Sequence, residues 1–151
     1  MRLLNRIEEL EKELLELKEL VKEEQDFPQD GDIYWLIDDE GSVFNTFYDN
    51  HYIDRYHQLI GNVFKTKEQA EFAVEKLKVE AELRKYSRPF ERGRFNHYIF
   101  IDTDGNHLKV NSLIYGQPQG TIYFESEEKV QQAIESVGED RIKKYIFGVE
   151  D

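Results

Sequence analysis

The sequence of 151 residues contains no cysteine and no long apolar run. Without cysteine it can form neither a disulfide nor a thiolate metal site, which is typical of proteins in a reducing compartment. A membrane-spanning helix needs roughly 20 consecutive apolar residues, and no stretch approaches that length. The first residues follow a charged, helical pattern, whereas a signal peptide would have an apolar core. We therefore expect a cytoplasmic protein without a membrane partner.

Basic residues are scarce too, because 20 Lys and Arg stand against 32 Asp and Glu, a net charge of −12. Such a charge repels nucleic acid, so direct nucleic-acid binding is not expected, and it attracts basic protein surfaces. A role in solubility alone is the simpler alternative. Aromatic residues make up 13% of the chain, which argues against disorder.

Motifs for catalysis and metal binding are also missing from the sequence. It has no nucleophile elbow and no glycine-rich phosphate loop. Asp102 and Asp104 indicate a turn, because an EF-hand loop needs a third oxygen ligand before its glycine. His51, Asp54 and His57 cannot all face one metal from a helix, since positions six apart lie on different faces. We expect no enzyme, no catalytic residue, no metal and no cofactor.

Residues 1–26 have the apolar spacing of a coiled coil. The seam residues, in steps of four and three, are Leu3, Ile7, Leu10, Leu14, Leu17 and Val21. The leucines outside this seam are Leu4, Leu15 and Leu20. They widen the apolar face, which leaves open a higher oligomer or a helix that folds back on its own domain. We expect self-association through the seam, as a homo-oligomer, with a dimer favoured.

Charged residues beside the seam favour a parallel dimer. With Ile7 at heptad position a, Arg6 of one helix would face Glu11 of the other. Glu13 would likewise face Lys18, so both pairs join opposite charges. Each exposed pair contributes only a few tenths of a kcal/mol, yet like charges would penalise other registers.

Beyond Pro28, two similar phrases, YWLIDDEG (34–41) and YIFIDTDG (98–105), predict strands that enter tight turns. The similarity resumes in NVFKTKEQAEFAVE (62–75) and IYFESEEKVQQAIE (122–135). There a short strand precedes a helix that begins at Thr66 or Ser126 as its N-cap. The two halves therefore predict a repeated unit of strand, turn, strand, loop, strand and helix.

The expected fold class is α+β, with a globular domain over residues 30–151 after the coiled-coil-like helix. Repeat 1 covers about residues 32–86 and repeat 2 about residues 96–148. We expect the two units to form one antiparallel sheet with helices on one face.

Residues 23–54 contain ten Asp and Glu residues and no Lys or Arg. Carboxylates steer a protein onto a basic surface, and interspersed aromatic side chains supply affinity when buried there. The alternative is that the aromatic residues form the core and the acids line its exposed face. The predicted partner-binding residues are Trp35, Asp38, Asp39, Glu40, Phe47, Tyr48, Asp49, Tyr52 and Asp54.

The segment RKYSRPFERGRF (84–95) is the one basic stretch of the sequence. Its Arg88, Arg92 and Arg94 are candidate anion contacts, because bases interleaved with aromatic residues suit RNA, a nucleotide or an acidic protein. We favour the other interpretation, in which they neutralise the acidic run of the same chain or of a dimer partner.

The strings GNVFKTKEQAEFAVEKLKVEAELRKY (61–86) and IYFESEEKVQQAIESVGEDRIKKYIFGVE (122–150) resemble a family of small proteins encoded by temperate phages and prophages of Gram-positive bacteria. The resemblance covers about residues 30–150 and names no functional residues. It implies expression in the bacterial host cytoplasm, where small acidic phage proteins bind and inhibit host factors.

We therefore expect a non-enzymatic phage accessory protein that inhibits an anti-phage defence protein, in the manner of an anti-CRISPR or another anti-defence protein. The expected partner is a host protein with a basic surface, such as a nucleic-acid-binding defence protein. Two alternatives stay open. One is a protein that binds or sequesters a signalling nucleotide, and the other is a phage structural or assembly protein.

Overall fold

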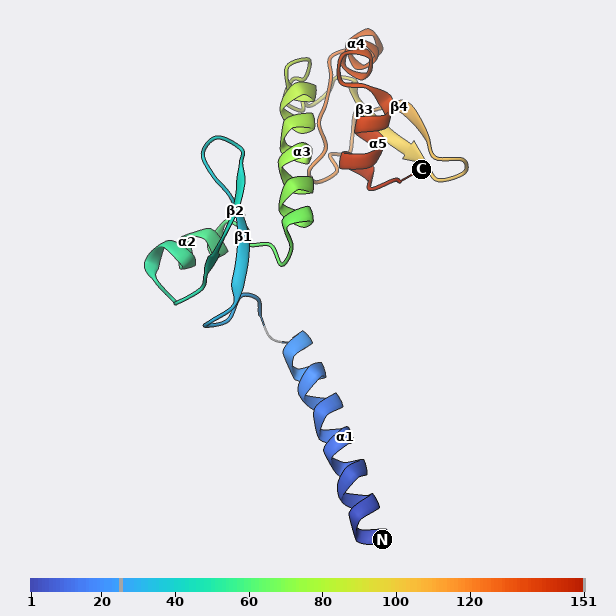
Figure 1. The fold of residues 1–151 in the computed structure, drawn as a ribbon. Helices are drawn as coiled ribbons and strands as arrows, with labels where there is room; N and C mark the ends of the chain where they lie inside the picture. The colour runs from blue at the N-terminus through green and yellow to red at the C-terminus, as the bar shows by residue number, and fades with distance from the viewer. Residues whose placement is uncertain (25, 151) are drawn as a thin grey trace. The chain divides into compact units, whose positions relative to one another are not determined.

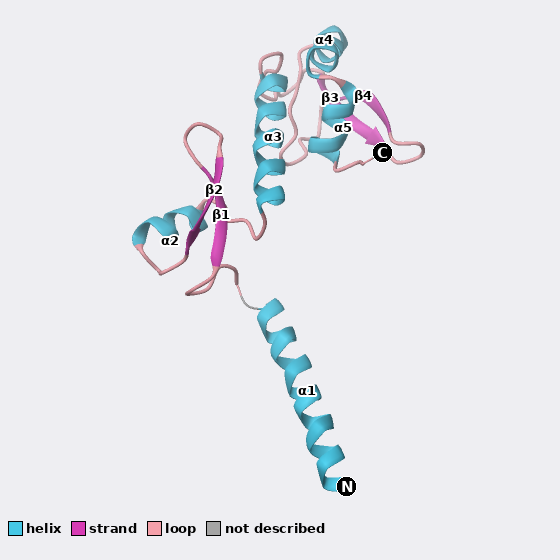
Figure 2. Cartoon of the chain, in the orientation of Figure 1, coloured by secondary structure: helices cyan, strands magenta, loops and turns pink. Residues whose placement is uncertain are grey.

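The computed structural model describes residues 1–24 and 26–150, without the side chains of residues 23 and 24. The protein is α+β, as predicted, and it divides into two compact units, Met1–Ala70 and Glu71–Asp151. Figure 1 shows the course of the chain, and Figure 2 shows its helices and strands. Residue 25, part of the predicted N-terminal helix of residues 1–26, lies outside the described residues.

Helix α1 (Arg2–Glu24) carries the predicted coiled-coil seam. Every seam residue is exposed, from 47% for Leu10 to 80% for Leu3. An apolar row of this kind is stable in water when another surface covers it.

The first unit is built on an antiparallel hairpin of β1 (Ile33–Ile37) and β2 (Val43–Phe47). Side chains alternate between the two faces of a strand, so β1 buries Tyr34 and Leu36 on one face. These two residues and Tyr48 form a small core. Phe64 pairs with Trp35 on the outer edge of β1 through two backbone hydrogen bonds of 2.8 and 2.9 Å.

Helix α2 (Tyr52–Leu59) follows the hairpin in a stretch where the sequence pattern predicts a loop. It starts with a capping box, in which the side chain of His51 accepts from the N–H of Ile53 and the side chain of Asp54 accepts from the N–H of His51. Figure 2 shows the helix next to the hairpin of β1 and β2.

Helix α3 (Lys67–Arg84) begins in the first unit and continues into the second. Its predicted cap at Thr66 is confirmed, because Thr66 Oγ1 accepts from the N–H of Gln69 at 3.2 Å. The division between the units thus falls within this helix, whereas the sequence predicts the end of repeat 1 near residue 86.

The second unit has a hairpin of β3 (Asn96–Asp102) and β4 (His107–Leu113), followed by α4 (Glu127–Val137) and α5 (Glu139–Phe147). Ser126 caps α4, as predicted, by accepting from the N–H of Lys129 at 3.2 Å. Helix α4 contacts both β3 and α5. The core of this unit consists of Val79, Leu83, Phe124, Val130, Ala133, Val137 and Ile142.

The predicted single sheet is wrong, because the two hairpins form separate two-stranded sheets. In each unit the short third segment lies on the outer edge of the first strand, with Phe64 opposite Trp35 and Phe124 opposite His97. In each hairpin one edge is therefore already paired within its own unit.

The repeat predicts closer agreement between the units than the structure shows. Its alignment of the two phrases matches Trp35 with Ile99, yet the residue that pairs with Phe124 is His97. The first unit also has helix α2 between its hairpin and third segment, whereas residues 114–122 contain no helix. The hairpins correspond in outline, and the segments after them differ.

Candidate partner-binding surface

A buried hydrogen-bond network joins α2 to the first hairpin. The hydroxyl of Tyr34 donates to Asp54 Oδ1 at 2.6 Å and lies 2.9 Å from His57 Nδ1. Because the hydroxyl has a single proton, the Nδ1 of His57 acts as the donor in the second bond. Tyr34 is fully buried and Asp54 is only 6% exposed. The two side chains thus hold the helix against the strand from within.

The carboxylate of Asp54 is the centre of this network. Its Oδ2 accepts from the backbone N–H groups of Asp49 and His51 at 3.1 and 3.3 Å. Burial raises the pKa of Asp54, but the hydrogen bonds from Tyr34, Asp49 and His51 outweigh it and lower the pKa to about 2. Burial, together with the bond to Asp54, raises the pKa of Tyr34 well above its usual value. Asp54 is therefore charged and Tyr34 neutral over the whole physiological range.

A second tyrosine anchors the other end of α2. The hydroxyl of Tyr48 donates to Gln58 Oε1 at 3.1 Å, and only 8% of this tyrosine is exposed. The side of α2 that meets the hairpin therefore consists of the polar residues Asp54, His57 and Gln58.

The apolar side chains of this segment point to solvent instead. Tyr52, Ile53, Tyr56, Leu59 and Ile60 are between 45% and 79% exposed. The rings of Tyr52 and Tyr56 meet edge to face, with centroids 5.9 Å apart. Helices of globular proteins normally bury such a face. This outward face, residues 52, 53, 56, 59 and 60, is called the α2 apolar face below.

The predicted partner-binding residues differ in their exposure to solvent. Those on the surface are Asp39, Glu40, Phe47, Asp49 and Tyr52, while Trp35 and Asp38 are half-buried. Tyr48 and Asp54 are buried and support α2 from beneath. Asp38 shapes the hairpin turn, since its Oδ1 accepts from the N–H groups of Glu40 and Ser42.

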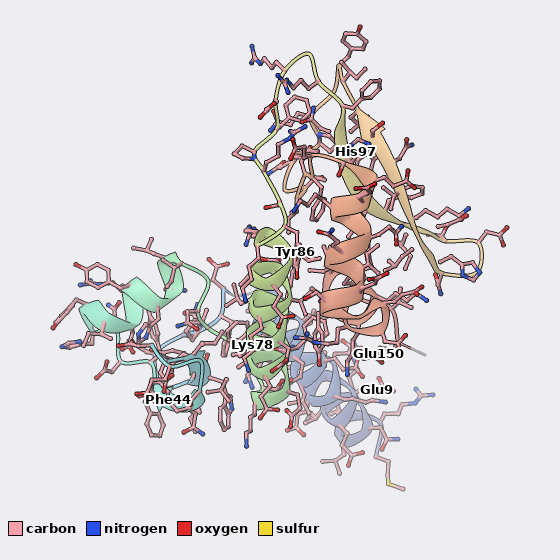
Figure 3. The ribbon with its side chains drawn as sticks, turned by 90° about the horizontal axis from the view of Figure 1, so that it is seen from above. Glu9, Phe44, Lys78, Tyr86, His97 and Glu150 are labelled. Atoms are coloured by element: carbon pink, nitrogen blue, oxygen red, sulfur yellow. The ribbon has the colours of Figure 1, made fainter. Side chains whose placement is uncertain are left out.

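The hairpin register separates the aromatic candidates. Phe47 pairs with Ile33, so it shares a face with Trp35, whereas Tyr34 and Leu36 occupy the opposite face. Helix α2 is bonded to Tyr34, on that opposite face. Trp35 and Phe47 therefore lie on one side of the hairpin, and Tyr52 lies with α2 on the other. Figure 3 shows Phe44 of the same hairpin, a further half-exposed aromatic side chain.

The basic segment is largely occupied by contacts within its own loop. Arg88 donates to Asn96 Oδ1 at 2.7 Å, to the carbonyl of Pro89 at 3.0 Å and to that of Phe95 at 2.8 Å. Arg94 pairs with Glu91 at 3.4 Å. These bonds fix the connection that enters β3, and a shallow hollow beside it is lined in part by Arg88.

These contacts give less support to the alternative of a nucleotide-binding protein, since the guanidinium of Arg88 already donates hydrogen bonds to three oxygen atoms. Arg92, in contrast, is exposed, so an anion contact there stays a prediction.

Within residues 1–24 and 26–150, no three His, Asp or Glu side chains are grouped so that they could hold a metal ion. None of the helices that the structure describes is long and apolar enough to cross a membrane.

The chain matches no protein-family model, no curated protein and no solved structure.

Four residues of the α2 apolar face, Ile53, Tyr56, Leu59 and Ile60, are absent from the predicted site. Their spacing along YIDRYHQLI is that of one helix face, so the sequence does contain the signal for an amphipathic helix. The same signal predicts that this face is buried. Its exposure follows from the bonds that Tyr34 and Tyr48 make with the polar face, which sequence spacing does not reveal.

Proposed function

We propose that the protein is a non-enzymatic accessory protein of a temperate phage or prophage, which binds and inhibits a host defence protein in the bacterial cytoplasm. The observation that carries the proposal is the set of exposed acidic and aromatic side chains in the first unit. Asp39, Glu40, Phe47, Asp49 and Tyr52 all reach solvent there.

The charge of this unit supports a basic partner. Residues 26–64 contain eight Asp and Glu residues and one basic residue, Arg55, a net charge of −7. Asp54 is the one acid of this set that is buried. A negative surface of this kind speeds encounter with a positive one and competes with nucleic acid for it. The partner we propose is a defence protein whose nucleic-acid-binding surface is basic.

A charge-reversal variant tests this function. Asp30→Lys, Asp39→Lys, Glu40→Lys and Asp49→Lys, all at exposed positions and combined in the full chain, should weaken binding by about 100-fold, because attraction becomes repulsion. The partner is recovered by affinity purification from infected host cells and its affinity for each variant is measured by calorimetry. Circular dichroism checks that the variant remains folded.

The matched control reverses four exposed acids of the second unit, Asp104, Glu125, Glu135 and Glu150. It alters the net charge equally and should bind within about threefold of the wild type, since it leaves the first unit unchanged. Equal affinities for both variants would contradict the proposed surface.

Self-association through α1 is part of the same proposal. The seam is exposed along its length, and in a parallel pair Arg6 faces Glu11 while Glu13 faces Lys18. In an antiparallel pair that aligns position a with position d, Glu13 would face its own copy. The charges thus favour two parallel chains, which would double the number of acidic surfaces offered to a partner.

Sedimentation velocity of two variants tests the dimer. Leu10→Glu places a charge inside the seam and should give a monomer, whereas Leu15→Glu, on the same helix but outside the seam, should leave the dimer. A monomeric wild-type chain at about 100 µM would contradict the proposal, because functional coiled-coil dimers form well below that concentration.

We also propose that the two units descend from a tandem duplication. Both hairpins turn at an Asp whose Oδ1 accepts a backbone N–H two residues later, Asp38 from Glu40 and Asp102 from Asp104. Both third segments end at a Phe beside the first strand. On this view the first unit gained helix α2 as an addition to a shared scaffold.

A further inference from the structure

The α2 apolar face is accounted for neither by the fold nor by the acidic surface. In an ordinary surface helix the apolar residues meet the protein and the polar residues meet water. In α2 this order is reversed, with Asp54, His57 and Gln58 inward and Tyr56 and Leu59 outward. Exposing this many neighbouring apolar side chains is unfavourable, and patches of this kind mark interaction sites.

The hydrogen bonds beneath α2 hold this helix, and with it the α2 apolar face, in a fixed orientation. A helix of eight residues does not persist by itself in water. Here the capping box at His51 fixes its first turn, while Tyr34 and Tyr48 bind its polar side through Asp54 and Gln58. A side chain that is ordered before binding loses less entropy on binding.

The spacing of the exposed side chains fits recognition of a helix by a groove. Tyr52, Tyr56 and Leu59 stand at positions i, i+4 and i+7, the anchors that a groove-binding helix uses. The edge-to-face contact of the two tyrosine rings holds them as one surface. Tyrosine is among the residues that most often dominate binding energy at interfaces.

The charges of the first unit indicate which kind of surface binds the α2 apolar face. A second copy of the first unit, Met1–Ala70, would bring a net charge of −9 against the same charge, which opposes a homotypic contact. Membrane-surface helices use Lys and Arg on their polar face, whereas Arg55 is the only base between residues 26 and 64. A groove rimmed with Lys and Arg complements both the apolar face and its acidic surroundings.

We propose that α2 is a docking helix, whose apolar face fills an apolar groove bordered by Lys and Arg side chains on the partner protein. This inference rests on the proposed function, since it names the element of the first unit that enters the partner. Asp39, Glu40 and Asp49 then meet the basic rim, and the helix supplies the buried centre of the contact.

A photo-crosslinking amino acid at position 56 of the full chain locates the contact in infected cells. The control carries the same amino acid at position 115, since Tyr115 is 98% exposed in the second unit. The expected result is a crosslink from position 56 alone, to a peptide in which apolar residues stand next to Lys or Arg. No crosslink at position 56, or one confined to the chain itself or to a second copy, would overturn the inference.

Affinity for the captured partner is then measured for two double variants. Tyr56→Ser with Leu59→Ser should bind about 100-fold more weakly, because it removes two anchors. The control, Phe95→Ser with Tyr115→Ser, replaces exposed side chains of the second unit and should bind within about twofold. All four side chains are exposed, so far-UV circular dichroism and the melting temperature should match those of the wild type.

The two proposals can fail separately in this experiment. If the charge-reversal variant loses binding while Tyr56→Ser with Leu59→Ser binds as the wild type does, the acidic surface is the contact and the docking helix is wrong. If neither variant loses affinity, both proposals are wrong.

Discussion

The two units of this chain attach helices to similar hairpins by opposite means. In the second unit α4 and α5 pack through apolar side chains, and seven buried residues form the core. In the first unit α2 is held by polar side chains bonded to two tyrosines, over a core of Tyr34, Leu36 and Tyr48. Burying apolar surface stabilises a unit, whereas directed hydrogen bonds position a helix and leave its apolar side chains exposed. The second unit thus has the larger core, and in the first unit the apolar side chains of α2 stay exposed.

Truncation of the larger core should have the greatest effect on stability. Phe124→Ala removes a ring that is 1% exposed and should lower the free energy of unfolding by about 3 to 5 kcal/mol. Phe64→Ala, at the corresponding half-buried position of the first unit, should cost less than about 2 kcal/mol. Urea unfolding of both variants measures the difference. Equal losses would show that the two cores are equivalent, contrary to the comparison.

Breaking the polar network should release α2 without unfolding the second unit. Asp54→Ala leaves the Tyr34 hydroxyl and two backbone N–H groups without their acceptor, at a cost of about 2 to 3 kcal/mol. Hydrogen exchange should accelerate for the amides of α2 and stay unchanged in α4. Asp39→Ala, an exposed acid of the same unit, serves as control and should alter neither. Unchanged exchange in α2 would mean that the network does not hold it.

The pH dependence of the first unit follows from the same groups. The pKa of Asp54 is about 2 in the folded chain, below its unfolded value, so its contribution is complete above about pH 4 and is lost as the pH falls toward 2. The pKa of Tyr34 is raised, so its contribution is complete below about pH 10 and is lost at higher pH. The rate of hydrogen exchange in α2, measured as a function of pH, follows both the acid limb, due to Asp54, and the alkaline limb, due to Tyr34.

Two variants separate these limbs. Asp54→Asn should remove the dependence between pH 4 and 2, and Tyr34→Phe should remove the dependence above pH 10. A Tyr34→Phe variant that still loses α2 above pH 10 would assign the alkaline limb to another group.

The helix caps should give the smallest difference, because the sequence places them alike in both units. Ser126→Ala and Thr66→Ala each remove one hydrogen bond to the first turn of a helix and should cost about 1 kcal/mol. Thermal unfolding measures both losses. A loss above about 2 kcal/mol at either site would show that the side chain has a further role.

The features that were predictable from sequence depend on neighbouring residues. The hairpin turns follow from Asp38 and Asp102 before their glycines, and the starts of α3 and α4 follow from Thr66 and Ser126. The periodicity of residues 2–24 indicated α1 in the same way. In each case a residue bonds with partners two to four positions away, so spacing alone contains the information.

The features that were missed depend on contacts between distant residues. Tyr34 and Asp54 are 20 positions apart, and their bond, with that of Tyr48 to Gln58, explains why α2 turns its polar side inward. The third segment of each unit also depends on a distant contact, because Phe64 and Phe124 pair with strands about 30 residues earlier. For the binding site, contact between the acidic, aromatic segment and a partner stays a prediction, and two of its residues, Tyr48 and Asp54, are internal supports.

Hydroxyl-radical footprinting of the tyrosines tests the central claim, that α2 is anchored by its polar side and offers its apolar side to a partner. In the free chain Tyr52, Tyr56 and Tyr115 should be oxidised rapidly, and the buried Tyr34 should be protected. Addition of the partner should protect Tyr52 and Tyr56 and leave Tyr115 as reactive as before. Protection of Tyr52 and Tyr56 in the free chain, or their unchanged oxidation in the complex, would contradict the account.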